Sequence, residues 1–322
     1  MNSTPSRPTH AQPPVRAAGE RITALLRLVE RGFDTEGLLE GRITKEDTVD
    51  YYDKSGIGYR LFHSREGAVH MALNYDGKFS RAGYDEQARR VAHHVAVEGC
   101  SAALELASGR GYNTRLLAER FPDVAFTGVD LTPSHVAFAR RATSRLPNVT
   151  FSVGDFEALP FDEASFDLVF AVESVCHAGD LDTVLAECRR VLRPGGILIL
   201  FDGYRLVELG RLPEPWRRSA RLVERSMSVA EGRLLADVLR AHERAGFSIR
   251  ETNDLSAAML PNLLRFQTLA LKLLKRPWIH RLLSIVMPQK LLENAIAGLL
   301  MAENVAAGVQ GYFETVARKE AP

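Results

Sequence analysis

The chain of 322 residues has little cysteine, almost no net charge and no long apolar run. Its cysteines, Cys100, Cys176 and Cys188, are odd in number and lack the spacing of a zinc knuckle, which argues against a disulfide framework or a metal site. A formal net charge of +1 gives no sign of nucleic-acid binding. No uncharged stretch reaches the roughly 18–20 apolar residues that a membrane-spanning helix needs. We therefore expect a cytoplasmic globular protein.

Composition and periodicity divide the chain into six expected segments. Residues 1–18 combine Pro, Ser, Thr and Arg without an apolar core, which is typical of a disordered tail and not of a signal peptide. The other segments are a helical N-terminal cap at 19–98, a core at 99–203, an insertion with the rest of the core at 204–254, a helical lid at 255–308, and the last strand and tail at 309–322.

Short β-type runs alternate with helical patterns from residue 101 onward. Thr132 is placed to cap a helix that Pro133 opens. The stretch 203–230 contains prolines and is expected to be irregular. The alternation predicts an α/β protein with a Rossmann-like, doubly wound, mostly parallel seven-stranded sheet. The expected strands are SAALELA, VAFTGVD, NVTFSV, FDLVFAV, GGILILFD, FSIRET and QGYFETVARK.

The turn after the first strand, in LELASGRGYNT, is rich in glycine but is not a dinucleotide fingerprint. A G-x-G-x-x-G loop needs its third glycine for close packing of helix and strand, and Thr114 stands at that position. The loop therefore disfavours a pyrophosphate cofactor such as NAD.

Carboxylates follow three successive strands. Glu105 lies at the end of the first strand, Asp130 closes the second, and Asp155 ends the third, in VGDFEALPF. Ligands of open parallel sheets bind outside the carboxyl ends of the strands, where a carboxylate such as Asp130 can accept hydrogen bonds from a ribose diol. A carboxylate or a backbone N–H near Asp155 can bind the edge of an adenine. These positions predict a nucleoside-containing cofactor.

These features resemble the class I S-adenosylmethionine-dependent methyltransferases, and within them the tocopherol and sterol C-methyltransferase-like group. The matching segments are LELASGRGYNT, FTGVDLTPSHVAFAR, VTFSVGDFEALPFDEASFDLVFAVESVCHA and ECRRVLRPGGILILFD. The resemblance implies S-adenosylmethionine as cofactor and assigns it a set of residues. Gly109 and Gly111 would approach the methionine moiety, Glu105 would lie near its ammonium through the loop, Asp130 with Leu131 would hold the ribose, and Asp155 with Phe156 the adenine.

Ala107 stands where that family usually has glycine. We expect ordinary β geometry at Ala107, so that the loop still binds the cofactor. The departure also leaves room for an alternative of another class, a non-catalytic partner subunit that binds the cofactor.

The segment VESVCHAGD supplies the candidate catalytic residues Glu173 and His177. They are four positions apart, so a helical turn would place both on one face above the cofactor. A histidine beside a carboxylate can accept a proton or orient an acceptor hydroxyl. The alternative is that Glu173 bonds loop backbone and His177 packs on the cofactor.

The segment YYDKSGIGYRLF resembles the stretch that covers the cofactor in fatty-acid cyclopropane and mycolate methyltransferases. The resemblance makes Tyr51, Tyr52, Tyr59 and His70 candidates for a cap over the cofactor. An aromatic face beside a sulfonium gains roughly 0.5–2 kcal/mol from cation–π attraction. The alternative is that these aromatics form one face of an amphipathic helix.

Residues 256–305 are rich in leucine and in basic residues. They are expected to form a helical lid over an acceptor pocket, or a peripheral membrane contact through 263–290, or ordinary core. The expected function is methyl transfer to carbon or nitrogen, with oxygen as a further option, of a hydrophobic sterol-, prenyl- or polyketide-like molecule. A cyclopropane-synthase-like lipid enzyme is an alternative, and a homodimer is one option for the oligomeric state. Neither a metal nor a nucleic-acid partner is expected.

Overall fold

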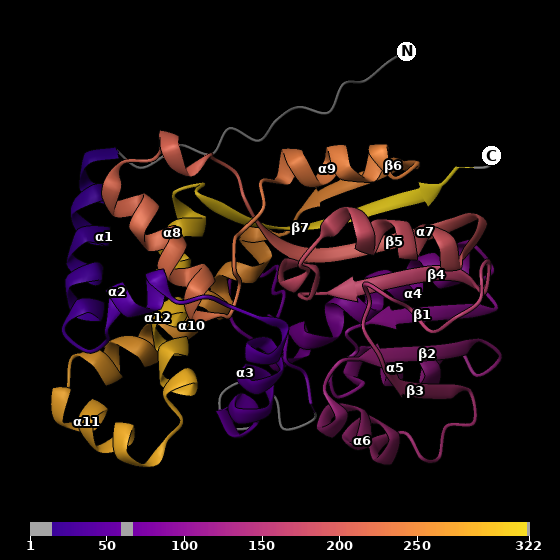
Figure 1. Ribbon diagram of the computed structural model, residues 1–322, viewed down its shortest axis with the longest axis horizontal. Helices are drawn as coiled ribbons and strands as arrows, with labels where there is room; N and C mark the ends of the chain where they lie inside the picture. Colours follow the sequence, from indigo (N-terminus) through magenta and orange to yellow (C-terminus); the bar gives the residue numbers. More distant parts are fainter. Residues whose placement is uncertain (1–14, 59–66, 321–322) are drawn as a thin grey trace.

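The computed structural model describes residues 15–58 and 67–320. Its core is a seven-stranded sheet with the order β3-β2-β1-β4-β5-β7-β6, in which β7 runs antiparallel to its neighbours (Figure 1). This topology confirms the predicted Rossmann-like α/β fold. The strands are β1 (Ala102–Leu106), β2 (Ala125–Asp130), β3 (Val149–Val153), β4 (Phe166–Val172), β5 (Leu192–Arg205), β6 (Phe247–Asp254) and β7 (Gln310–Lys319).

Strand register brings the sequence-predicted site residues to one edge of the sheet. Leu106, the last residue of β1, pairs with Val129 of β2 and with Ala171 of β4. The residues that follow these positions therefore lie side by side. Ala107, Asp130 and Glu173 belong to that group, although up to 66 residues separate them in the chain.

Helices cover both faces of the sheet. One face buries Phe126 and Phe170 beneath α4 and α5. The other buries Leu104 and Val169 beneath α7 and α9. The parallel strands are apolar on both sides for this reason. The helices around the sheet are α4 (Glu86–Val97), α5 (Tyr112–Arg120), α6 (Pro133–Ala142), α7 (Leu181–Val191) and α9 (Leu235–Arg244).

A second apolar core lies beside the sheet, in a bundle of helices. Helices α1, α8, α10 and α12 bury Ile22, Trp216, Ala270 and Leu300 against one another. In Figure 1 the bundle lies at the left, with α11 at its lower corner and α3 between bundle and sheet. The helices of this part are α1 (Val15–Glu30), α2 (Thr35–Glu40), α3 (Lys45–Gly58), α8 (Glu214–Ser226), α10 (Ser256–Leu274), α11 (Pro277–Val286) and α12 (Gln289–Ala306).

Helix α8 corrects the expectation that 203–230 is irregular. Pro215 lies in its first turn, where the missing N–H of proline is not needed for a helical hydrogen bond. Trp216 and Val223 then bury one side of the helix in the bundle. The proline therefore opens a helix here. Within the described ranges, no helix has both the length and the apolarity to cross a bilayer.

Candidate active site

The turn after β1 is built from residues in the left-handed region of backbone space. Ala107, Gly109 and Gly111 have φ angles of +46°, +54° and +75°. The sequence predicts β geometry for Ala107, and this prediction is wrong. An L-residue pays roughly 1–2 kcal/mol for a left-handed conformation, so Ala107 is strained. A Cβ on Gly111 would lie 2.6 Å from Cζ of Phe151, which makes glycine necessary where α5 begins.

Glu105 faces the inside of this turn and not an open cleft. Its side chain is buried and accepts hydrogen bonds from the Asn113 amide at 3.0 Å, the Thr114 N–H at 3.1 Å and the Thr114 hydroxyl. Burial raises the pKa of Glu105 to about 7 despite these bonds. Glu105 thus fixes the first turn of α5 beneath the loop, which is the indirect position that the resemblance implies.

Asp130 ties the loop to the end of β2. Its Oδ2 accepts the Gly109 N–H at 2.8 Å, and its Oδ1 accepts the Thr132 N–H at 2.8 Å. Nδ1 of His135 lies 3.6 Å from Oδ1. The side chain of Thr132 makes no capping hydrogen bond to α6, which corrects its predicted role. Asp130 therefore holds the turn after β1 and the turn after β2 together by accepting one backbone N–H from each.

A small cleft of about 90 Å³ opens above these residues, and we call it the cofactor cleft. Of the predicted cofactor residues, six line it: Ala107, Gly109, Asp130, Leu131, Asp155 and Phe156. Glu105 and Gly111 lie behind it. Tyr59 and the side chain of Tyr51 lie outside the described residues, while Tyr52 and His70 line the cleft. The sequence reasoning missed other lining residues, among them Lys45, Val69, Thr132, His135 and Ser174.

The lining fits an adenosyl sulfonium compound. Asp130 accepts two backbone N–H groups, and a carboxylate has about four lone-pair sites, so capacity remains for a ribose diol. Among the residues that the structure describes, the buried Ser174 hydroxyl has no hydrogen-bond partner. Leu131 and Phe156 add apolar surface suited to an adenine ring.

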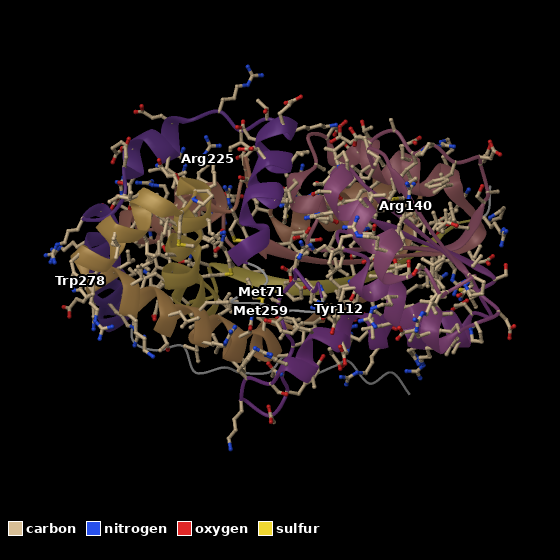
Figure 2. All side chains as sticks on the ribbon, turned by 90° about the horizontal axis from the view of Figure 1, so that it is seen from below. Met71, Tyr112, Arg140, Arg225, Met259 and Trp278 are labelled. Carbon is tan, nitrogen blue, oxygen red and sulfur yellow. The ribbon has the colours of Figure 1, made fainter. Side chains whose placement is uncertain are left out.

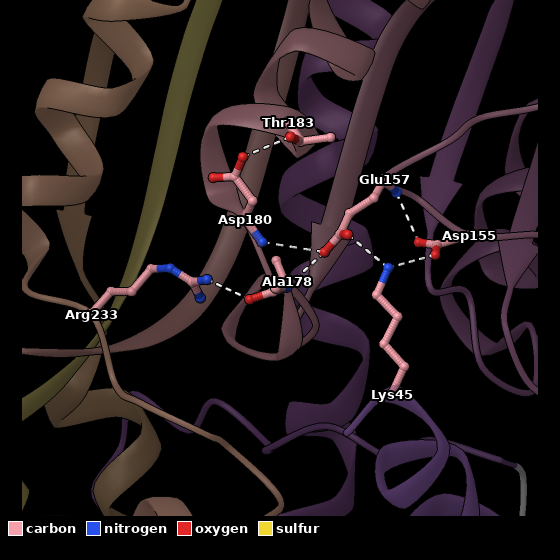
Figure 3. A network of polar contacts seen from close by, with 8 residues as sticks. Lys45, Asp155, Glu157, Ala178, Asp180, Thr183 and Arg233 are labelled. Carbon is pink, nitrogen blue, oxygen red and sulfur yellow. Dashed lines mark hydrogen bonds and ion pairs between the residues drawn. The ribbon is translucent and has the colours of Figure 1, made fainter. Parts of the chain in front are cut away.

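A network of ion pairs holds α3 across this cleft (Figure 3). Nζ of Lys45 lies 2.7 Å from Oδ2 of Asp155 and 2.6 Å from Oε2 of Glu157. Glu157 also accepts the Gly179 N–H at 2.6 Å. Asp155 lies in the turn after β3, which ends at Val153, and not within the strand. Typical ligand pockets have about 300–1,000 Å³, so we expect α3 to move outward when a ligand of nucleoside size binds.

Glu173 follows β4 in a left-handed conformation, with φ +51°. Its Oε1 accepts the N–H of Met71 at 2.7 Å, so it bonds loop backbone as the alternative reading expects. Burial raises the pKa of Glu173 to about 8. At this pKa the protonated acid, which can donate a hydrogen bond, is the favoured form near pH 7.

His177 ends a single 3-10 turn, Val175–His177, that starts after Glu173. The expected helical turn with both side chains on one face is therefore wrong. Nδ1 of His177 lies 3.1 Å from the Ser228 carbonyl, and Nε2 lies 3.0 Å from the Tyr52 hydroxyl. Because a carbonyl only accepts, Nδ1 carries the proton and Nε2 accepts from Tyr52. Burial lowers the pKa of His177 to about 4, which keeps the ring neutral at pH 7.

A larger cavity of about 470 Å³ lies between the sheet and the bundle, and we call it the apolar cavity. Its walls come mainly from α10 and α12, with Phe266, Leu273 and Met301 among them, and β5 and β7 close it on the side of the sheet. The two cavities share Tyr52, Val69, Glu173 and His177. Asp202 also borders the apolar cavity, and burial raises its pKa to about 6. The strand-end rule that identified the other acids also applies to Asp202, in LFD.

The core matches a known family, described as "Methyltransferase domain", over residues 104–200. Phthiotriol/phenolphthiotriol dimycocerosates methyltransferase 1 of Mycobacterium ulcerans (strain Agy99) is 37% identical over 113 residues, which are 35% of this chain and 41% of that protein. The S-adenosyl-L-methionine-dependent Diels-Alderase iccD of Talaromyces variabilis is 31% identical over 232 residues, 66% of this chain and 76% of that protein. The crystal structure of the cyclase SpnF superposes with a TM-score of 0.70 at 23% identity, covering 87% of this chain and 98% of that one.

The chain thus spans about two fifths of the mycobacterial relative and three quarters of the fungal one. The likeness to SpnF shows a shared fold. The family match, the fungal relative and the sheet order agree with the resemblance found in the sequence, and they confirm the predicted family and its cofactor, S-adenosylmethionine. The chain belongs to the class I S-adenosylmethionine-dependent methyltransferases.

Proposed function

We propose that this protein methylates a hydrophobic small molecule, sterol-, prenyl- or polyketide-like, at carbon or nitrogen, with oxygen as a further acceptor atom. The observation that carries the proposal is the junction of the two cavities at Tyr52, Val69, Glu173 and His177. An acceptor in the apolar cavity would face the cofactor cleft there. When bound, S-adenosylmethionine would supply a methyl group to an electron pair of the acceptor. The sulfur would keep the electrons of the broken carbon–sulfur bond, and the methylated acceptor would lose a proton to solvent, so that the net gain is one CH₂.

The residues at the junction are suited to orienting an acceptor. The apolar walls exclude water and hold the reactants aligned, which methyl transfer requires. Glu173 donates a hydrogen bond to an oxygen of the acceptor, and Nε2 of His177 accepts one from it or from Tyr52. A proton taken by His177 would create a buried imidazolium against a pKa of about 4. This supports positioning by His177 over proton abstraction.

A second candidate function is ring closure in the same cavity. The fungal relative is named a Diels-Alderase, and the superposed structure is that of a cyclase. The neutral acid Glu173 favours this candidate because a hydrogen bond to a substrate carbonyl stabilises charge that develops during cycloaddition. Two carbon–carbon bonds form from π electrons of one molecule, and no atom leaves. The product would have the mass of the substrate, whereas methylation adds one CH₂.

The experiment compares His177→Ala with His93→Ala, a substitution of an exposed histidine on α4. Calorimetry gives the dissociation constant of S-adenosylmethionine, and mass spectrometry follows a panel of sterols, prenyl compounds and polyketides. We expect His177→Ala to lower kcat at least about tenfold, with the dissociation constant changed less than about threefold. His93→Ala should match the unchanged protein.

Each other outcome points to a different function. A dissociation constant that rises while kcat holds would make His177 a cofactor-packing residue. Cofactor binding without product from any acceptor would favour the non-catalytic partner subunit. A rearranged product of unchanged mass would favour ring closure, and a cyclopropane or branched fatty acid would favour the cyclopropane-type lipid enzyme.

A further inference from the structure

Helix α11 exposes large apolar side chains along one stripe. Trp278, Leu282 and Ile285 are 67%, 57% and 81% exposed. Their spacing of four and three residues places them on the same side of the helix. Figure 2 shows Trp278 at the edge of the molecule, away from the sheet. Apolar residues gathered in this way on a surface usually mark a contact site.

Leu283, on the opposite side of α11, and Met287, directly after the helix, line the apolar cavity. Lys272 and Arg276 also line the cavity and are exposed to solvent, so they mark an opening where α10 meets α11. The exposed stripe of α11 therefore lies next to the opening of the cavity, which is formed by the end of α10 and the turn before α11.

The charged residues of the segment that contains α11 are all basic, and at its end Lys290 lies 3.9 Å from Glu293. Between Asp254 and Glu293 the sequence contains no acidic residue, while it contains the basic residues Arg265, Lys272, Lys275, Arg276, Arg281 and Lys290. Lysine or arginine near an anionic lipid surface contributes roughly 1 kcal/mol each. Two copies of this face would bring like charges together, which disfavours a symmetric dimer through it.

We propose that α11 and the turn before it dock on an anionic lipid membrane. Trp278, Leu282 and Ile285 enter the interface, where tryptophan is favoured, and Lys275 lies against the phosphates. The opening between α10 and α11 then faces the bilayer, so that a water-insoluble acceptor passes into the apolar cavity without crossing water. This last step rests on the proposed function, whereas the docking does not.

The test measures docking without any acceptor. The full-length protein is sedimented with vesicles of phosphatidylcholine alone and with vesicles that also contain phosphatidylglycerol. Trp216 is buried and Trp278 is exposed, so a blue shift of tryptophan emission on adding vesicles reports on α11. We expect binding to the phosphatidylglycerol vesicles that falls as salt rises, together with the blue shift.

Variants assign the binding to the named residues. Leu282→Ser/Ile285→Ser should weaken binding at least about tenfold, since it removes two apolar anchors. Lys275→Glu should weaken it about tenfold and only for the anionic vesicles. The matched control is Val97→Ser, which changes an equally exposed apolar residue on α4 and should bind as the unchanged protein.

Three results would overturn the docking: no binding to either vesicle, equal binding by the double variant, or a dimer that the double variant dissociates. The dimer would mean that a second copy covers the stripe. Vesicle binding with no methylated product from any acceptor would contradict the proposed function and leave the docking standing. Methylation of an acceptor in detergent, without vesicle binding, would contradict the docking and leave the proposed function standing.

Discussion

The neutral state of Glu173 can be tested by replacing it with glutamine, which has the same shape. Its pKa of about 8 lies above the ordinary 4.5, so folding holds a proton that the unfolded chain loses. Between those two pH values the unfolded state binds fewer protons, and stability falls as pH rises. Below pH 4.5 Glu173 is protonated in both the folded and the unfolded state, so its full contribution to stability is present. The gap of about 3.5 units corresponds to roughly 3–5 kcal/mol at 1.36 kcal/mol per unit.

Glu173→Gln has no proton to lose and keeps an acceptor for the Met71 N–H. Its free energy of unfolding should match that of the unchanged protein near pH 4.5 and exceed it by about 3–5 kcal/mol at pH 8. Urea titrations at a series of pH values give the midpoints, with the slope m as a check that the same surface unfolds. Glutamine also donates, so turnover at pH 7 should persist if Glu173 acts as a donor.

The control is Glu187→Gln on α7. Hydrogen bonding to Arg190 lowers the pKa of Glu187, so its stabilisation is present at neutral pH and lost as pH falls. This variant should be less stable at pH 7 and approach the unchanged protein in acid. If the curves of Glu173→Gln and the unchanged protein run parallel from pH 4.5 to 8, Glu173 is ionised in the fold. The donor role would then be wrong, and turnover lost in Glu173→Gln would point to a carboxylate base.

Three further substitutions test the cofactor cleft. Ala107→Gly should raise the free energy of unfolding by about 0.5–1 kcal/mol, because relief of the backbone strain at φ +46° outweighs the added freedom of the unfolded chain. A lower free energy of unfolding in urea titrations would show that Ala107 is not strained. Asp130→Asn should weaken S-adenosylmethionine binding by roughly 1–3 kcal/mol in calorimetry, while exposed Asp123→Asn leaves it unchanged. Lys45→Met should cost less than about 1 kcal/mol of stability, since Lys45 is 43% exposed, yet speed cofactor release in stopped-flow measurements because α3 loses its anchor. Equal release rates would mean that α3 does not control exchange.

The sequence predicted the strands, which have a local periodicity, and the site residues that a parallel sheet brings to one edge. The run QGYFETVARK was expected as a strand, and β7 spans Gln310–Lys319. Asp130 could be placed because the carboxyl ends of parallel strands meet at one edge, whichever residues connect them. The seven strands and their mostly parallel arrangement follow from the same local periodicity.

Other features depend on contacts that no local pattern contains. Lys45 lies 110 residues from Asp155, and the Ser228 carbonyl that fixes the tautomer of His177 lies 51 residues away. The left-handed conformation of Ala107 runs against the preference of alanine and is imposed by the turn between β1 and α5. Helix α8 was missed because proline is a breaker inside a helix but an opener at its first turn.

The junction of the two cavities is held together by three distant parts of the chain. Tyr52 comes from the cap, Glu173 and His177 come from the core, and the backbone carbonyl of Ser228, which contacts His177, comes from the insertion. The ring of His177 is held between the first and the last of these. The same helix carries Lys45 and Tyr52, so an outward movement of α3 would also separate Tyr52 from Nε2 of His177. We therefore expect closure of α3 over the cofactor to orient the ring of His177 in the same step.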